Sequence, residues 1–219
     1  TLEPALLGVM IAPSRAGGCL AVAAFLAFLA RTPFKLVLVD AFRRRMLPRT
    51  KLAAVIAGIE ISILAVLIIT AERLTDDRRW WIAVAIAAPL VMVEFWFEAR
   101  SRGRRALPEI AGALAIAAVA PAIVLADGGA ARVAVAVWVV IAARVITSIP
   151  HVRWQIDRAH GRVSSARTQL GDGAALAAVI IATLIEPAVA LGGTAIVAVV
   201  VVQSIRRRRT LAPIAVIGI

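Results

Sequence analysis

Long apolar runs alternate with short polar clusters along this chain, and most of the runs have about 20 residues. A run of that length spans the hydrocarbon core of a bilayer as a helix. We expect seven complete spans, at about 19–42, 52–71, 80–97, 107–126, 133–149, 174–190 and 194–205. Shorter apolar pieces at 2–12 and 211–219 indicate the end of one further helix and the start of another. The pattern predicts an all-α, polytopic membrane helical bundle of about nine transmembrane helices, clipped at both ends, in a single domain over 1–219.

Composition supports this class and excludes others. Apolar residues make up 62% of the chain, the mean hydropathy is +0.92, and there is no tyrosine. A net charge of +12 would point to nucleic acid in a soluble protein. Here membrane topology accounts for the arginines, so we expect no nucleic-acid partner. Cys19 is the sole cysteine, which excludes an internal disulfide and a cysteine metal cluster.

Arginine clusters occupy every second gap between the apolar runs. The dense clusters are Arg43–Arg45 with Arg49 and Lys51; Arg100, Arg102, Arg104 and Arg105; Arg153, Arg158, Arg162 and Arg167; and Arg206–Arg209. Positive charge is retained on the cytoplasmic side of a membrane. The alternation therefore predicts a cytoplasmic N-terminus, an outward end of the ninth helix, and contact between the basic face and anionic membrane lipids.

Several ionisable residues lie within the expected spans, where charge is costly and usually faces a cavity or a partner. Arg31 and Lys35 are four residues apart and share a helix face. Arg31 lies roughly 16 Å below the helix end near Phe42, at 1.5 Å per residue, and Arg144 has a similar depth in the sixth span. The acidic residues are Glu60, Glu94, Glu98, Glu109 and Glu186.

These intramembrane charges have three interpretations. They neutralise one another and hold the helices in register, or they line a polar cavity that opens to the cytoplasm, or they form a proton or ion pathway. A basic cavity would suit the phosphate, diphosphate or carboxylate headgroup of a lipid. The candidate ligand-binding residues are Arg31, Lys35, Asp40, Arg44, Arg49, Arg144, Arg153 and Asp157. No catalytic residue is assigned.

Asp40 and Asp157 are single aspartates in two arginine-rich loops. Acting together they could hold Mg²⁺ through its water shell, whereas each alone is an ion-pair partner for its neighbours. His151 and His160 lack companions at metal-ligand spacing, so we interpret them as polar loop residues.

Several segments resemble the YwiC-like bacterial membrane proteins. They are FLARTPFKL at 28–36, Asp40 with the following arginines, EARSRGRR at 98–105, EIAG at 109–112, and Ala143–Val145 with Val152 and Arg153. The opening LEP at 2–4 and APS at 12–14 also fit. The resemblance implies the cytoplasmic (inner) membrane of a bacterium.

The layout is more distantly similar to UbiA-type intramembrane prenyltransferases. That resemblance implies nine helices and two Asp-rich motifs, in the loops after the second and sixth helices. Here those loops retain Asp40 and Asp157, with Arg43 and His160 where further aspartates are expected. It implies an isoprenoid or quinone-type lipid as ligand and a divergent transferase as one activity. The alternatives are a non-catalytic subunit of a larger membrane complex and a small-molecule transporter.

Overall fold

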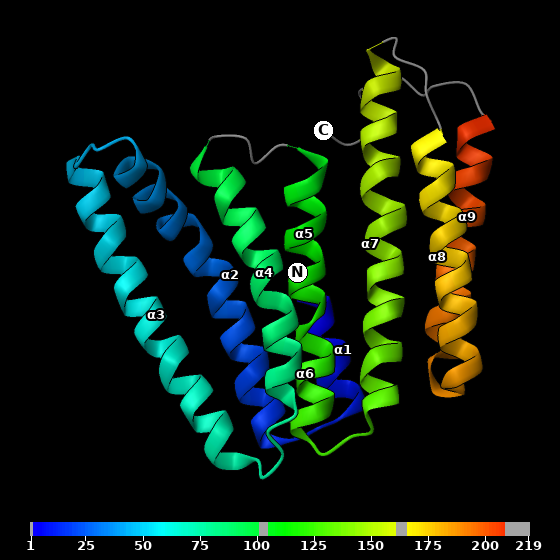
Figure 1. Ribbon diagram of the computed structural model, residues 1–219, viewed down its shortest axis with the longest axis horizontal. Helices are drawn as coiled ribbons and strands as arrows, with labels where there is room; N and C mark the ends of the chain where they lie inside the picture. Colours follow the sequence, from blue (N-terminus) through cyan, green and yellow to red (C-terminus); the bar gives the residue numbers. More distant parts are fainter. Residues whose placement is uncertain (1, 101–104, 161–165, 209–219) are drawn as a thin grey trace. The chain divides into compact units, whose positions relative to one another are not determined.

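The computed structural model describes residues 2–100, 105–160 and 166–208, and every element in this part of the chain is helical. The helices are α1 (Glu3–Ile11), α2 (Arg15–Phe42), α3 (Pro48–Leu74), α4 (Trp80–Ala99), α5 (Ala106–Ala117), α6 (Val119–Ala126), α7 (Ala131–Ala159), α8 (Ala166–Ile185), the 3-10 turn η1 (Pro187–Val189) and α9 (Ala190–Arg208) (Figure 1). Seven helical stretches are long and apolar enough to cross a membrane, with α5–α6 and η1–α9 each counted once.

These stretches confirm the all-α class and the seven complete spans. The total of nine is not confirmed. The helix α1 has only nine residues, and the predicted ninth helix at 211–219 lies outside the described residues. The chain forms two compact units, Thr1–Trp138 and Val139–Ile219, whose boundary falls within α7. The single domain over 1–219 stays a prediction.

In the first unit, α2 and α3 form an antiparallel hairpin joined by a short basic turn (Figure 1). The turn closes α2 with two backbone hydrogen bonds, from Arg44 N–H to Ala41 carbonyl at 2.9 Å and from Arg45 N–H to Asp40 carbonyl at 2.8 Å. This Schellman pattern requires a left-handed residue at the first position after the cap, which is usually glycine. Arg44 fills it with a φ of 53°.

The helix α3 starts at once after this turn. Pro48 stands in its first turn, where a missing N–H costs nothing. Thr50 caps the same turn, since its Oγ1 accepts the Leu47 N–H at 3.3 Å. The sequence therefore specifies both ends of the hairpin connection.

Close helix packing in the first unit depends on small residues around Ile123, which is fully buried on α6. A Cβ at Gly8 of α1 would come within 2.9 Å of the Ile123 side chain, and one at Gly17 of α2 within 2.8 Å. Small residues of this kind let membrane helices approach closely. The small residues thus allow α1 and α2 to pack closely against α6.

The predicted continuous span at 107–126 is divided in the structure. The break falls at Ala118, between α5 and α6. Proline has no N–H, and its ring clashes with the carbonyl four residues earlier. Pro121 acts in this way on the carbonyl of Ala117, which ends α5.

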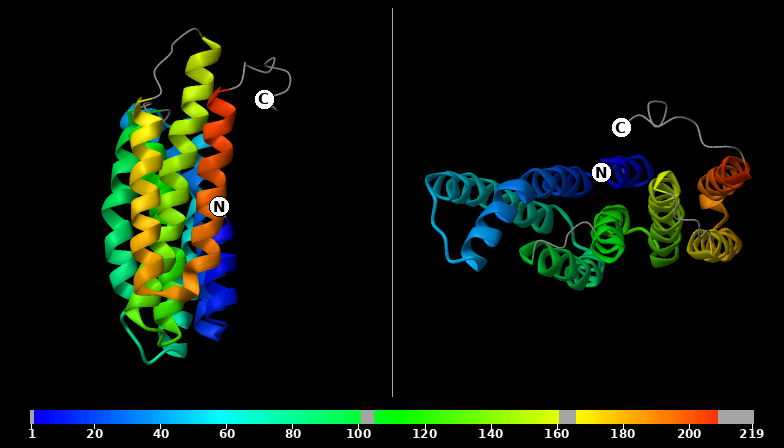
Figure 2. Two further views of the ribbon diagram at one scale, coloured as in Figure 1. Left: turned by 90° about the vertical axis from the view of Figure 1, so that its right-hand side faces the viewer. Right: turned by 90° about the horizontal axis from the view of Figure 1, so that it is seen from above.

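The second unit contains the rest of α7 with α8, η1 and α9, and its core is formed by Ala143, Ala175, Val179, Ile196 and Val200. Seen from above in Figure 2, α8 and α9 lie side by side, in agreement with their packing contacts. The helix α7 contains the predicted span at 133–149 and continues beyond it, through Pro150 to Ala159. Pro150 cannot donate to the Ile146 carbonyl. That oxygen lies beside Gly171 of α8, where a Cβ would come within 3.0 Å of it.

The helix α8 also differs from the sequence prediction of 174–190. It begins at Ala166 and ends at Ile185. The early end has a local cause, since Glu186 precedes Pro187 and a residue before proline is disfavoured in helical geometry. Because α8 begins before 174, its first turns contain polar residues that hydropathy does not assign to a span.

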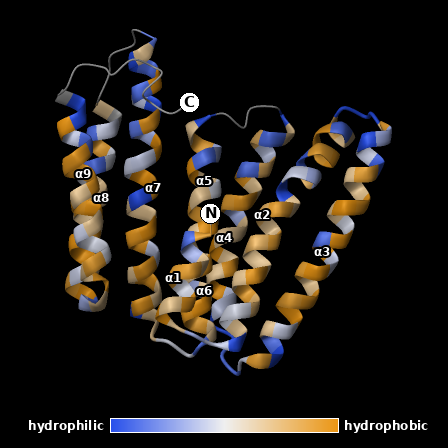
Figure 3. Ribbon diagram, turned by 180° about the vertical axis from the view of Figure 1, so that it is seen from behind, coloured by the Kyte–Doolittle hydropathy of each residue, from blue (hydrophilic) through white to orange (hydrophobic). Residues whose placement is uncertain are grey.

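Figure 3 shows hydrophobic residues along the helices of both units and hydrophilic residues concentrated toward the helix ends. Within the first unit, α2 ends and α3 begins at the same end as α4 ends and α5 begins (Figure 1). The cluster Arg43–Arg49 therefore shares one end with Arg100 and Arg105. This agrees with the predicted alternation of charge in the first unit. Its assignment to the cytoplasm stays a prediction.

Candidate functional site: a charged pocket in the first unit

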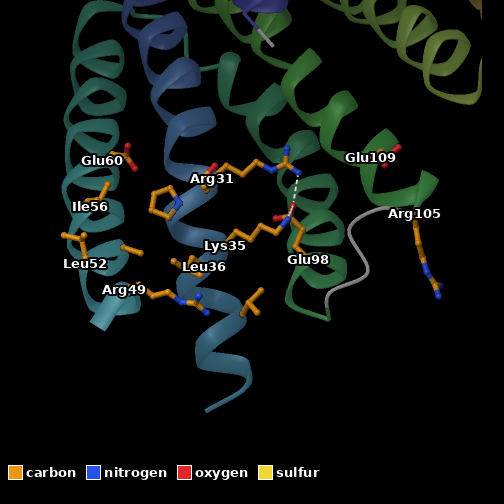
Figure 4. A pocket seen from close by; sticks show the side chains of 14 residues that line it. Arg31, Lys35, Leu36, Arg49, Leu52, Ile56, Glu60, Glu98, Arg105 and Glu109 are labelled. Carbon is orange, nitrogen blue, oxygen red and sulfur yellow. Dashed lines mark hydrogen bonds and ion pairs between the residues drawn. The ribbon is translucent and has the colours of Figure 1, made fainter. Parts of the chain in front are cut away.

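A pocket of about 1230 Å³ lies among α2, α3, α4 and the start of α5 (Figure 4). Its charged lining consists of four cations and three carboxylates: Arg31, Lys35, Arg49, Arg105, Glu60, Glu98 and Glu109. Its apolar lining includes Leu36 and Val39 on α2 and Leu52 and Ile56 on α3. Small-molecule sites usually have volumes of roughly 300–1,000 Å³, so this pocket has room for a headgroup and part of a chain.

The charged wall of the pocket is built by α2 and α4. Arg31 Nη2 donates to Glu98 Oε1 at 2.8 Å, and Lys35 Nζ donates to the same oxygen at 3.0 Å. Figure 4 shows both side chains reaching from α2 to Glu98. Arg31 Nη2 also forms an ion pair with Glu94 Oε1. The prediction that Arg31 and Lys35 share one face of the helix is thus confirmed. Their partners are two glutamates on α4, one helical turn apart.

Burial is unequal within this charged quartet, by which we mean Arg31, Lys35, Glu94 and Glu98. The Glu98 side chain is 2% exposed, whereas Arg31 is 40% and Lys35 46% exposed. Each cation has further N–H groups beyond those that contact the glutamates. The carboxylates are therefore held inside the protein, and the cations present their remaining donors to the pocket.

Gly112 of α5 makes room for this arrangement. A Cβ at Gly112 would lie 2.5 Å from the carboxyl carbon of Glu94. The Glu94 carboxylate therefore rests directly against the α5 backbone. This contact explains why the EIAG segment, which the sequence offers only as a family feature, belongs to the site.

The Asp40 carboxylate is held by two neighbouring side chains. Thr50 Oγ1 donates to its Oδ2 at 2.5 Å, and Arg49 Nε lies 3.9 Å from the same oxygen. The Asp40 side chain is 5% exposed. A carboxylate committed to a hydroxyl donor and a guanidinium does not fit the role of a magnesium ligand. The ion-pair alternative fits this geometry.

The other predicted site residues are distributed between the two units. Arg49 lines the pocket, and Arg44 is exposed on the turn between α2 and α3. Arg144, Arg153 and Asp157 belong to the second unit, so their participation in one site with Arg31 stays a prediction. Across residues 2–100, 105–160 and 166–208, no group of three or more His, Cys, Asp or Glu residues could hold a metal ion.

The second unit holds a buried ion pair that sequence reasoning missed. Arg207 Nη1 lies 2.6 Å from Asp172 Oδ2, with side-chain exposures of 11% and 6%. The Arg207 carbonyl accepts a hydrogen bond from Arg158 at 3.2 Å. Asp172 precedes the span predicted at 174–190, and its place on α8 reveals its burial. The signal available was its position two residues before the apolar run.

Seven apolar helical stretches among the described residues define a multi-pass α-helical membrane protein, and the first unit carries the charged pocket. The family model described as YwiC-like protein matches residues 1–124, more than half of the chain. The chain belongs to the YwiC-like family, and the matched region contains every residue of the pocket. No curated protein and no solved structure matches the chain, so the likeness to UbiA-type enzymes stays a prediction.

Proposed function

We propose that the pocket of the first unit binds a phosphorylated lipid, with an isoprenoid or quinone-type chain as the expected tail. The observation that carries this proposal is the placement of Arg31 and Lys35. Both present spare N–H donors to a pocket that also has an aliphatic wall on α2 and α3. Guanidinium and ammonium groups are the side chains that bind phosphate, and they do so without a metal.

The pocket divides into two parts that suit the two parts of such a lipid. The headgroup lies against Arg31 and Lys35, with Arg49 at the end of the pocket near the basic turn. The chain lies along Leu36 of α2 and Ile56 of α3. The Arg31 backbone is roughly 16 Å from the end of α2, but its side chain reaches Glu98 in the last turn of α4, so the phosphate is held toward the basic end of the unit and the chain extends along the aliphatic wall. Binding, rather than prenyl transfer, is the activity that these groups support.

Native mass spectrometry of the purified protein tests the proposal, with lipidomics of whatever co-purifies. We expect a phosphorylated lipid to be retained by the native protein and lost from Arg31→Gln and Lys35→Gln. Arg78→Gln is the matched control, because Arg78 is an exposed cation that pairs with Glu72 away from the pocket. Equal lipid retention in all four proteins would refute the proposal.

A second candidate function is that of a subunit in a larger membrane complex. The helix α3 packs on α2 and exposes Ile59, Ile63, Val66 and Ile69 along its length. An exposed apolar surface on a membrane helix is available to a partner helix as well as to lipid. Blue-native electrophoresis of gently solubilised membranes distinguishes the two. Migration only as a monomer or small homo-oligomer would argue against the subunit role.

For localisation we propose the cytoplasmic membrane of a bacterium, with the basic end of the first unit in the cytoplasm. The support is the arginine cluster at that end and the positive-inside rule. Single cysteines placed at Arg44 and Asp76, in a Cys19→Ser background, test it. We expect an impermeant thiol reagent applied outside intact cells to label position 76 and to spare position 44.

A further inference from the structure

The charged quartet is neutral only while its two cations stay with its two carboxylates. Arg31 and Lys35 contribute two positive charges, and Glu94 and Glu98 contribute two negative ones. The other charged groups that line the pocket also balance, with Arg49 and Arg105 against Glu60 and Glu109. A bound phosphodiester adds one negative charge that no group already present in the pocket offsets.

Glu98 is the member of the quartet that this extra charge affects most. Its Oε1 takes both of its contacts from Arg31 and Lys35, and its Oε2 is buried and accepts no hydrogen bond within the described residues. A phosphate that binds the spare donors of both cations shares their positive charge, so the buried Glu98 carboxylate is compensated less than it is without the ligand. An uncompensated charge in such surroundings is neutralised by protonation.

Glu94 lies close enough to share the proton. Both carboxylates contact the same atom, Arg31 Nη2, and Glu94 is confined against Gly112 on its other side. Two carboxylates that share one site favour a state in which one of them carries a proton. The pair therefore acts as one proton acceptor.

We propose that Glu94 and Glu98 form a proton-binding site, and that a phosphate-bearing ligand and one proton occupy the pocket together. The inference rests on the proposed function, because the ligand phosphate is what brings the extra negative charge to Arg31 and Lys35. The proton comes from solvent and ends on a glutamate carboxyl oxygen, so the occupied pocket regains its original net charge. A protein of this kind binds its anionic ligand with proton uptake, which is the coupling that proton-linked movement of a lipid or anion requires.

Isothermal titration calorimetry on the purified protein in detergent tests this coupling. The probe is a short-chain phosphatidylglycerol, whose diester phosphate keeps its charge across the pH range used. Titrations in two buffers with different ionisation enthalpies give the number of protons taken up. We expect about one proton per ligand and, by linkage, an affinity that weakens up to about tenfold for each unit rise in pH.

Variants locate the proton. In Glu98→Gln the proton count should fall toward zero, and the affinity should become independent of pH. Glu94→Gln provides a second test at the other carboxyl group. Glu72→Gln is the control and should keep the native count, since Glu72 pairs with Arg78 and lies outside the pocket.

The two proposals fail in different ways. A ligand that binds without proton uptake, or uptake that persists in both Glu98→Gln and Glu94→Gln, overturns the proton site and leaves the lipid pocket standing. Absence of phosphatidylglycerol binding, or equal binding to Arg31→Gln, overturns the pocket itself and with it the coupling.

Discussion

Removal of Arg31 should destabilise the protein more than removal of its partner Glu98. Arg31→Gln leaves two carboxylates without their shared cation, and the Glu98 side chain is only 2% exposed. Loss of one partner from a fully buried pair costs roughly 3–5 kcal/mol. Arg31 is 40% exposed and Lys35 remains 3.0 Å from Glu98, so we reduce the expected cost to about 2 kcal/mol.

The reverse substitution, Glu98→Gln, is milder. It leaves Arg31 with Glu94, and Lys35 is 46% exposed and regains contact with water or headgroups. We expect about 1 kcal/mol or less. For a chain of this size, 1 kcal/mol corresponds to roughly 2–4 °C in Tm, so Arg31→Gln should lower Tm by about 4–8 °C and Glu98→Gln by about half of that or less.

Thermal unfolding in detergent, followed by the fluorescence of the five tryptophans, measures both shifts at one scan rate. The double variant Arg31→Gln with Glu98→Gln should cost less than the sum of the single variants by roughly 1 kcal/mol, because the second change removes a charge that the first left unpaired. Arg78→Gln controls for the loss of an exposed cation. Equal shifts for the two single variants, or strict additivity, would refute the reasoning.

Three further predictions concern the first unit. Thr50→Val leaves the buried Asp40 carboxylate without its hydroxyl donor and should cost about 1–3 kcal/mol in thermal unfolding, with Thr50→Ser close to native. Arg44→Gly relieves a left-handed arginine, so Tm should rise by the equivalent of roughly 1 kcal/mol or less; a lower Tm would contradict this. The hydrogen bonds from Arg79 hold the pKa of Asp77 below its usual value. This pair therefore stabilises the fold above about pH 4, and its contribution is lost on further acidification. The Tm difference between native and Asp77→Asn should be present at about pH 7 and absent near about pH 2.

The number and approximate position of the spans follow from hydropathy because the thickness of the bilayer sets the length of an apolar run. The ends of the helices do not follow. The helix α7 continues ten residues past the predicted end at 149, since hydropathy reports where the chain leaves the hydrocarbon region and not where it stops being helical. The break at Ala118 depends on Pro121, whose effect within a long span ranges from a kink to a divided helix.

For the site, the spacing of residues along one helix predicts which side chains share a face. Which faces of different helices meet could not be predicted from the sequence. Arg31 and Lys35 share a face because they are four residues apart, and Glu94 and Glu98 share one for the same reason. That the two faces meet depends on α2 lying against α4, which one sequence does not specify. For Asp40 the sequence left two alternatives, a magnesium site shared with Asp157 and an ion pair with its neighbours. The contacts with Arg49 and with Thr50 on the next helix fit the second alternative and make Asp40 part of the hairpin connection.

The ion pair of the second unit and the charged quartet of the first unit differ in how far their cations are exposed. In the second unit, Arg207 and Asp172 are both nearly buried, at 11% and 6% exposed, so neither has a face left for a ligand. In the first unit, the carboxylates are buried, whereas Arg31 and Lys35 remain 40–46% exposed beside a pocket of about 1230 Å³. Replacement of a buried pair by apolar residues of similar volume is often neutral or stabilising, so stability alone is a weak reason for four charges at this depth. Cations that contact buried carboxylates on one side and line a cavity on the other are the observation on which the proposed anion site rests. The same two carboxylates, Glu94 and Glu98, are the groups to which we assign the proton in the proposed coupling.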